Sequence, residues 1–422
     1  MNEEFLSYLW QFRHLSPDLK TESGDPIAIL HPGDRNTDGG PDFFNARLRI
    51  GDTIWAGNVE IHVRASNWIK HGHQLDHAYD NAILHVVYEA DIPVNYPSGA
   101  PIQTLVLKNQ FPNWIFDRYQ QMMMNHQWIP CFNQLVTTTD HGFDLWAPSL
   151  AVERLVSKAL YIKQLWENCR NNWEDAFYQH LGSAFGFKIN SLPFELLTKS
   201  LPLKIVKKHG DDIFRLEALL FGQSGMLGNP HNDLYPKELL QEYLFLQKKY
   251  DLKPITEVAW KFLRLRPTNF PTLRISQWAN FIFSTRNRFF DILEGGSFNE
   301  VIESLNICAS PYWDTHYIFE KPSSFRKKII GKNSVNLLVI NGIVPFLFFY
   351  GLEKDQPALR VKALNFLEQA GGEQNAVIIH WAEAGLPVLN AMQTQALLHL
   401  KKFYCDKKNC LNCRIGSALL AK

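Results

Sequence analysis

Residues 41–63, which read PDFFNARLRIGDTIWAGNVEIHV, decide the fold of the first part of the chain. Apolar residues alternate with arginines over residues 44–50, and they alternate again with polar residues over residues 54–63. Alternation with a period of two is typical of β-strands, and the Gly-Asp pair between the two segments favours a tight turn. The stretch therefore predicts a β-hairpin whose second strand carries Glu60 and His62 on one face.

The sequence around this hairpin predicts an α/β domain. A helix is predicted over residues 3–14, because Asn2 can cap it and apolar residues recur at helical spacing. Two short apolar runs, over residues 83–88 and 102–107, predict further strands. The polar segment 66–81 between the hairpin and these runs predicts a helix or a loop.

The pattern changes near residue 130. From residue 143 onward, amphipathic runs with helical spacing follow one another, and one of them covers residues 255–265. A chain of 422 residues is long enough for two or three domains. We therefore expect an α/β domain over residues 1–130. A mainly α-helical domain over residues 131–422 would follow it and end in a cysteine-rich motif.

The composition narrows the function classes. Because 43 Lys and Arg stand against 42 Asp and Glu, the net charge is +1, which excludes a purely electrostatic nucleic-acid binder. The first residues do not resemble a secretory signal, and six cysteines are too few for a disulfide scaffold, so we expect a cytoplasmic protein. The apolar stretch 335–351 is interrupted by polar residues and a proline. It is predicted to be a buried core segment, and no membrane partner is expected.

Residues with metal-binding chemistry concentrate in the first domain. Five of the fifteen histidines lie between residues 62 and 85. Glu60 and His62 share a strand face, and Asp42 arrives from the preceding loop. Carboxylates favour Mg²⁺ or Mn²⁺, and added imidazoles extend the choice to Zn²⁺ or Fe²⁺. The alternative is that Glu60 and His62 are solvated residues on the wet face of a sheet.

The spacing of these residues resembles the signature of the PD-(D/E)XK nuclease superfamily. There an acidic residue begins one strand, and the next strand of the hairpin carries an acid, any residue and Lys. Here Asp42 is followed eighteen positions later by Glu60-Ile61-His62, so His62 stands where that superfamily has Lys. The resemblance covers residues 1–107 and implies a restriction-endonuclease-like core.

The same resemblance implies a metal-dependent nuclease or phosphodiesterase acting on nucleic acid. Asp42 and Glu60 would hold a divalent ion, Mg²⁺ or Mn²⁺, with His62 as a further ligand or as the group that positions or deprotonates a water molecule. Glu3 or Glu4 would supply another acid from the first helix. The remaining candidate catalytic residues, which would contact the phosphate or the leaving group, are His71, His73 and Tyr79.

Two alternatives stay open. Replacement of Lys by His62 is compatible with a catalytically inactive protein that binds nucleic acid or another partner. The His71-Gly-His73 pair with its nearby acids also suits a metal-dependent hydrolase of small molecules. The sequence leaves the substrate, the identity of the metal and the oligomeric state undetermined.

A second candidate metal site lies at the C-terminus, where Cys405, Cys410 and Cys413 fall within nine residues. Thiolates suit Zn²⁺ and iron–sulfur clusters, and both need four ligands. Candidates for the fourth ligand are Cys131, Cys169, Cys308 and the histidines. Cys131 would join the two ends of the chain, because it lies just after the first domain. The alternative is three reduced cysteines without a metal.

Over its whole length the chain also resembles a bacterial family described only as a domain of unknown function. The blocks that carry this resemblance include Gly40-Pro-Asp-Phe43, residues 57–62, residues 83–86 and residues 266–271. The resemblance implies that both ends of the chain belong to one functional unit.

Overall fold

The chain folds into two compact units. The computed structural model describes residues 1–36, 38–96, 98–136, 142–256, 260–263, 265–285 and 291–421. Unit 1 combines Met1–Gly142 with Lys402–Lys422, and unit 2 is Phe143–Lys401. The boundary between the units falls after residue 142, whereas we expected it at residue 130. The C-terminal segment belongs to unit 1, whereas we expected it in the second domain.

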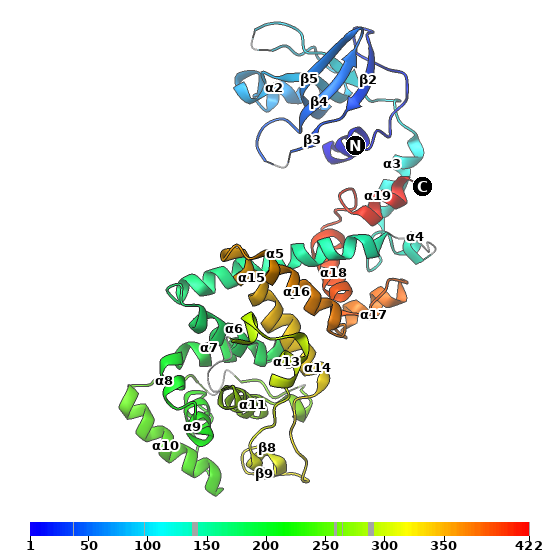
Figure 1. Ribbon diagram of the computed structural model, residues 1–422. Helices are drawn as coiled ribbons and strands as arrows, with labels where there is room; N and C mark the ends of the chain where they lie inside the picture. The colour runs from blue at the N-terminus through cyan, green and yellow to red at the C-terminus, as the bar shows by residue number, and fades with distance from the viewer. Residues whose placement is uncertain are drawn as a thin grey trace. The chain divides into compact units, whose positions relative to one another are not determined.

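Unit 1 is built on a mixed seven-stranded sheet (Figure 1). Its main path runs in the order β1 (Leu19–Lys20), β2 (Pro26–His31), β4 (Phe43–Ile50), β5 (Thr53–Arg64), β6 (Ala82–Glu89) and β7 (Thr104–Val106), and β3 (Asp34–Arg35) pairs with β4. The strands from β1 to β5 pair antiparallel, whereas β5, β6 and β7 pair parallel. The predicted hairpin and the two later strands are confirmed, and β1, β2 and β3 were not predicted.

Close packing between β5 and β6 depends on a glycine. A Cβ atom at Gly57 would overlap the side chain of Ile83 and the carbonyl oxygen of Asn81. The absence of a side chain at Gly57 therefore allows β6 to pack closely beside β5. The register pairs Glu60 with His85 across these two strands.

Helix α1 (Glu3–Gln11) places its first turn beside β5. The Asn2 side chain accepts a hydrogen bond from the backbone N–H of Phe5 at 3.0 Å, as the predicted N-cap requires. The apolar side of the helix is fully buried, including Leu9 and Trp10. This packing fixes the direction in which Glu3 leaves the helix.

The crossover from β5 to β6 consists of short helical turns. They are α2 (Asn67–Lys70), η1 (His73–Leu75) and η2 (His77–Tyr79). Trp68 and Tyr79 are buried and anchor this segment. The polar stretch 66–81 therefore folds over the end of the sheet, which agrees with the predicted helix or loop.

The C-terminal segment packs on unit 1. Helix α19 (Arg414–Ala421) contacts α3 (Asn113–Met124). The Tyr8 hydroxyl donates to the carbonyl oxygen of Ser417 at 3.3 Å, and the Arg35 guanidinium donates to Asn412 Oδ1 at 2.6 Å. These hydrogen bonds join residues that are 409 and 377 positions apart.

Unit 2 is mainly helical, as predicted. Its helices are α5 (Phe143–Asn168), α6 (Trp173–Phe185), α7 (Phe187–Ser200), α8 (Leu203–Lys208), α9 (Ile213–Gln223), α10 (Leu234–Tyr250), α11 (Pro271–Ser284), α12 (Asp291–Glu294), α13 (Phe298–Ser304), α14 (Lys332–Leu338), α15 (Val344–Glu353), α16 (Pro357–Gln369), α17 (Ala376–Glu383) and α18 (Ala391–Leu400). A small hairpin joins β8 (His316–Ile318) to β9 (Lys321–Pro322).

The helix predicted over residues 255–265 is wrong for the part of that range that the structure describes, which is irregular. Polar groups of this segment form hydrogen bonds with residues that are distant in the sequence instead of with one another. Trp260 Nε1 donates to the carbonyl oxygen of Ser224, and the backbone N–H of Lys261 donates to Asn190 Oδ1, both at 2.9 Å.

One segment of the described chain, Lys332–Glu353, is long and apolar enough to cross a membrane, but 78% of its most apolar window is buried inside the protein. The π-helix η6 (Val339–Ile343) interrupts it between α14 and α15. This burial confirms the prediction of a core segment over residues 335–351.

Candidate functional site

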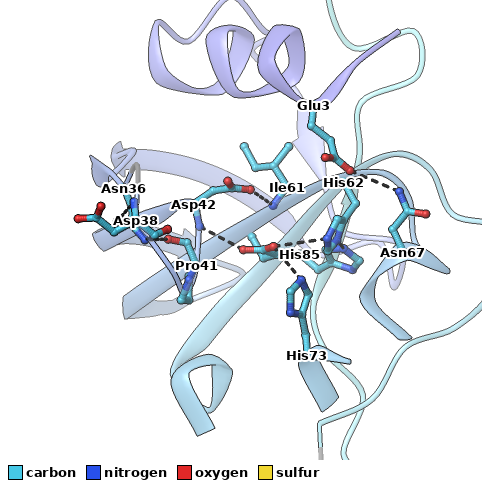
Figure 2. Close-up of polar contacts among 11 residues, drawn as sticks. Glu3, Asn36, Asp38, Pro41, Asp42, Ile61, His62, Asn67, His73 and His85 are labelled. Carbon is cyan, nitrogen blue, oxygen red and sulfur yellow. Dashed lines mark hydrogen bonds and ion pairs between the residues drawn. The ribbon is translucent and has the colours of Figure 1, made fainter. Parts of the chain in front are cut away.

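Two carboxylates meet across the hairpin. Asp42 lies directly before β4, and its backbone N–H donates to Glu60 Oε2 at 3.1 Å. The backbone N–H of Ile61 donates in return to Asp42 Oδ2 at 2.9 Å (Figure 2). Each carboxylate is thus held by the backbone of the other strand.

Imidazoles surround the second carboxylate. Glu60 Oε1 lies 3.4 Å from His62 Nε2 and 3.2 Å from His73 Nε2. His62 Nδ1 is 2.8 Å from Nε2 of His85, which lies on the next strand (Figure 2). One ring nitrogen from each of His62, His71 and His73 lies within 4.8 Å of the others.

The side chains at the centre of the site are buried. Glu60 is 5% exposed, His62 is 1% exposed and His85 is fully buried, so the solvated-face alternative for Glu60 and His62 is wrong. The crossover covers them, because the ring of Tyr79 stacks on that of His73 with centroids 3.9 Å apart and the ring of Trp68 packs edge-on against both.

A third acid comes from the first helix. Glu3 is half-buried, its carboxylate accepts a hydrogen bond from Asn67 at 3.4 Å, and its charge raises the pKa of both Asp42 and Glu60. Glu4 is exposed. Of the two acids predicted for this role, Glu3 is the one that faces the site.

Burial and the negative charge of neighbouring carboxylates together raise the pKa of the acids. Burial is the largest cause that raises the pKa of Asp42 and of Glu60, and the charge of Asp42 raises the pKa of Glu60 further. Carboxylates that repel one another in a buried site favour a cation between them. Burial also raises the pKa of Tyr79, so its phenol stays protonated at neutral pH.

The histidines are kept neutral. Burial, followed by the neighbouring imidazoles, lowers the pKa of His62, His73 and His85. Neutral imidazole is the form that binds metal ions. Among the described residues His73 Nε2 has no hydrogen-bond partner, since its contact with Glu60 has the distance of an ion pair without the alignment of a hydrogen bond. A buried ring nitrogen in this situation fits a metal ligand.

The structure brings together all six residues predicted for the catalytic site: Asp42, Glu60, His62, His71, His73 and Tyr79. It adds His85 of β6, which was not among the predicted site residues. His85 is buried and also supports the ring of His62. The signal that identifies it is the parallel register of β5 and β6, which is not readable from the sequence.

Comparison with known proteins gives the family. The family described as "protein of unknown function (DUF2851)" has a model that matches residues 3–376. The chain belongs to this family. Curated proteins and solved structures gave no match. The DUF2851 match includes the acids and histidines of the site, and it ends before Cys405.

Three of the predicted cysteines also come together in this DUF2851 chain. Cys131, Cys410 and Cys413 are buried free thiols of unit 1. Burial is the largest cause that raises the pKa of each thiol, and charge interactions add to it for Cys131 and Cys410. Cys413 acts on Cys131, and both of them act on Cys410. Residues 279 positions apart are thus neighbours.

The surroundings of these thiols restrict their positions. The backbone N–H of Gly416 donates to Cys413 Sγ at 3.4 Å, and a Cβ at Gly416 would overlap the backbone of Cys410. Cys405 ends the π-helix η7 (Lys401–Cys405) and is half-buried. Cys169 and Cys308 belong to unit 2.

Proposed function

We propose that this protein is a divalent-metal-dependent hydrolase that cleaves phosphodiester bonds in nucleic acid. One observation carries the proposal: the carboxylates of Asp42, directly before β4, and of Glu60, on β5, each accept a backbone N–H from the other segment, beside three ring nitrogens that lie within 4.8 Å of one another. The order of α1, the β4–β5 hairpin and the parallel strand β6 agrees with the core of the PD-(D/E)XK superfamily, which supports the same reaction class.

The residues present fit a divalent ion. Asp42 and Glu60 supply oxygen ligands, and His62 and His73 direct ring nitrogens toward Glu60. A bound ion would lower the pKa of a water molecule and offset charge on the phosphate. Glu3 adds negative charge that strengthens the hold on a cation.

We assign different roles to the histidines of the site. His62 is buried and contacts His85 and Glu60 through its two nitrogens, so we assign it a positioning role. His71 is the exposed member of the cluster. It is therefore the group best placed to accept the proton of an attacking water molecule or to donate one to a leaving oxygen.

A second candidate is a hydrolase of small molecules. The observation that favours it is the gathering of three imidazoles, since imidazole ligands suit Zn²⁺ or Fe²⁺ better than Mg²⁺. Elemental analysis and substrate choice separate the two candidates.

The test uses the full-length protein, first analysed for bound metals and then incubated with labelled single- and double-stranded DNA and RNA in Mg²⁺ or Mn²⁺. We expect cleavage that Glu60→Gln abolishes and that Glu89→Gln, an exposed control at the end of β6, retains. Metal binding at the site with cleavage of small phosphodiesters alone would favour the second candidate. Absence of both metal and cleavage would contradict both and favour an inactive binding protein.

We also propose that Cys131, Cys410 and Cys413 bind a metal as thiolates, with Cys405 as the fourth ligand. Support comes from their joint burial and from the backbone N–H donated to Cys413. Their free thiols fit the reducing, cytoplasmic environment that we infer.

Of the two centres that four thiolates suit, an iron–sulfur cluster and a single zinc ion, we choose the cluster for the test that follows.

Iron and acid-labile sulfide in the purified protein would support the cluster. Cys410→Ser should lose both, whereas Cys169→Ser in unit 2 should keep them. Stoichiometric zinc would overturn the choice of a cluster, and absence of both metals would overturn the thiolate centre.

A further inference from the structure

Unit 2 contains a cavity of about 770 Å³ that no step of the proposed function uses. Its walls come from α5, α6, α7, α14, η6, α17 and α18, and from residues 372–375. Volumes of about 300–1,000 Å³ are typical of sites for small molecules. Part of the wall is apolar and includes Phe187, Leu337 and Val377, whereas other parts carry charged and amide side chains.

A chain of polar side chains reaches the cavity through Arg154, Asn341 and Glu373, which line it. Lys158 Nζ donates to Asn341 Oδ1 at 2.9 Å, and Asn341 Nδ2 donates to Glu373 Oε1 at 3.1 Å. On the other side, Arg154 Nε donates to Gln395 Oε1 at 2.6 Å, and Gln395 Nε2 donates to the same Glu373 oxygen at 3.0 Å. Two amides therefore connect two cations to a single carboxylate.

With Lys158 protonated, this network carries one more positive charge than negative charge. Among the described residues neither Arg154 nor Lys158 forms a direct ion pair with a carboxylate. Burial, followed by the charge of Arg154, lowers the pKa of Lys158 to about 7, so the ammonium form is a state that a nearby anion would stabilise. A buried cation without a counter-ion is costly.

Two further features of the cavity wall are typical of a binding site. His180 lines the cavity, and among the described residues its Nε2 is buried without a hydrogen-bond partner. Asn341 lies in the π-helix η6, a distortion that is frequent at functional sites. A Cβ at the next residue, Gly342, would press on Leu181 of α6, so the π-helix approaches α6 closely and holds Asn341 at the wall.

We propose that this cavity binds a small organic anion, whose carboxylate or phosphate group is held by Arg154 and Asn341 while its apolar body lies against Phe187 and Leu337. The guanidinium provides a planar donor pair suited to either group, and Lys158 provides the balancing charge. This site lies in unit 2, so it is independent of the metal centres of unit 1.

The test measures thermal stability of the full-length protein against increasing phenyl phosphate or benzoate, with benzyl alcohol as the neutral analogue. A ligand that binds only the folded protein stabilises it by RT ln(1 + [L]/Kd), so the melting temperature rises with the logarithm of the ligand concentration above Kd. We expect such a concentration-dependent rise with at least one anion and none with the alcohol. The absence of a rise with both anions, or an equal rise with the alcohol, would overturn the proposal.

Variants that change the charge of the network should change the affinity for the anion in opposite directions. Lys158→Met should weaken anion binding about tenfold, which is the effect of losing one favourable charge in a buried site. Glu373→Gln should strengthen binding, because it removes the one opposing charge of the network. Lys163→Met is the control, since Lys163 lies on the same helix and pairs with Glu353 at 3.2 Å.

These variants also distinguish binding from a structural role. A purely structural Lys158 would change the melting temperature of the ligand-free protein and leave the anion-induced rise unchanged. If Lys158→Met does not fold, Glu373→Gln decides alone. Weaker anion binding by Glu373→Gln would contradict the charge argument.

Discussion

Replacing Glu60 by Gln should stabilise the metal-free protein while abolishing its response to metal. Glu60 is 5% exposed and lies beside Asp42 and within the field of Glu3. These surroundings, with burial as the largest cause, raise its pKa from an ordinary value of 4.5 to about 9. Gln keeps the shape and accepts the same hydrogen bond from the backbone of Asp42, but it carries no charge.

The sign and size follow from proton linkage. A carboxyl whose pKa is raised on folding contributes full stability below its unfolded pKa, and this contribution is lost as the pH rises toward the folded pKa. From about pH 4.5 to pH 9 the contribution of Glu60 to the free energy of unfolding without metal should therefore fall, by at most about 1.4 kcal/mol per pH unit. At pH 7 the accumulated cost is at most about 3.4 kcal/mol, so we expect Glu60→Gln to recover about 1–3 kcal/mol.

The assay is urea unfolding of both proteins with a chelator at pH 5, 6, 7 and 8, repeated at pH 7 with Mn²⁺. Between pH 7 and pH 8, where His62, His73 and His85 are neutral in the folded and the unfolded protein, the wild type should lose stability with rising pH and regain it with Mn²⁺. Over this range the variant should show a flatter pH profile and little response to Mn²⁺. A variant that is less stable than the wild type at pH 8 without metal, or that Mn²⁺ stabilises equally, would refute the reasoning.

Three further outcomes are expected. Gly57→Ala should lower the free energy of unfolding by about 1–3 kcal/mol in urea, because its methyl group would overlap β6, whereas Gly39→Ala, with open space around it, should be nearly neutral. Asn2→Ala removes the cap on α1 and should cost about 1 kcal/mol, and an unchanged urea midpoint would contradict that role. His85→Phe removes the ring that supports His62, so Mn²⁺ affinity measured by calorimetry should fall about 10–100-fold, and unchanged affinity would remove His85 from the site.

The elements that were predictable depend on neighbours in sequence. Alternation marks β4 and β5, and the Asn2 cap with its apolar stripe marks α1, because each pattern is local. The strands β1 and β3 escaped prediction because two residues carry too little pattern. The segment 255–265 was predicted wrongly because its polar groups bind distant partners, as Trp260 does with Ser224.

The sequence by itself determined that Glu60 and His62 share a strand face near Asp42, because side-chain direction alternates along a strand. Their burial was decided only by the tertiary structure, since the crossover covers that face and β6 places His85 beside Glu60 in the sheet. The same holds for the pairing of His62 with His85, and for the approach of Cys410 and Cys413 to Cys131. These neighbours are far apart in sequence, and only the packing of the sheet and of the returning C-terminal segment brings them together.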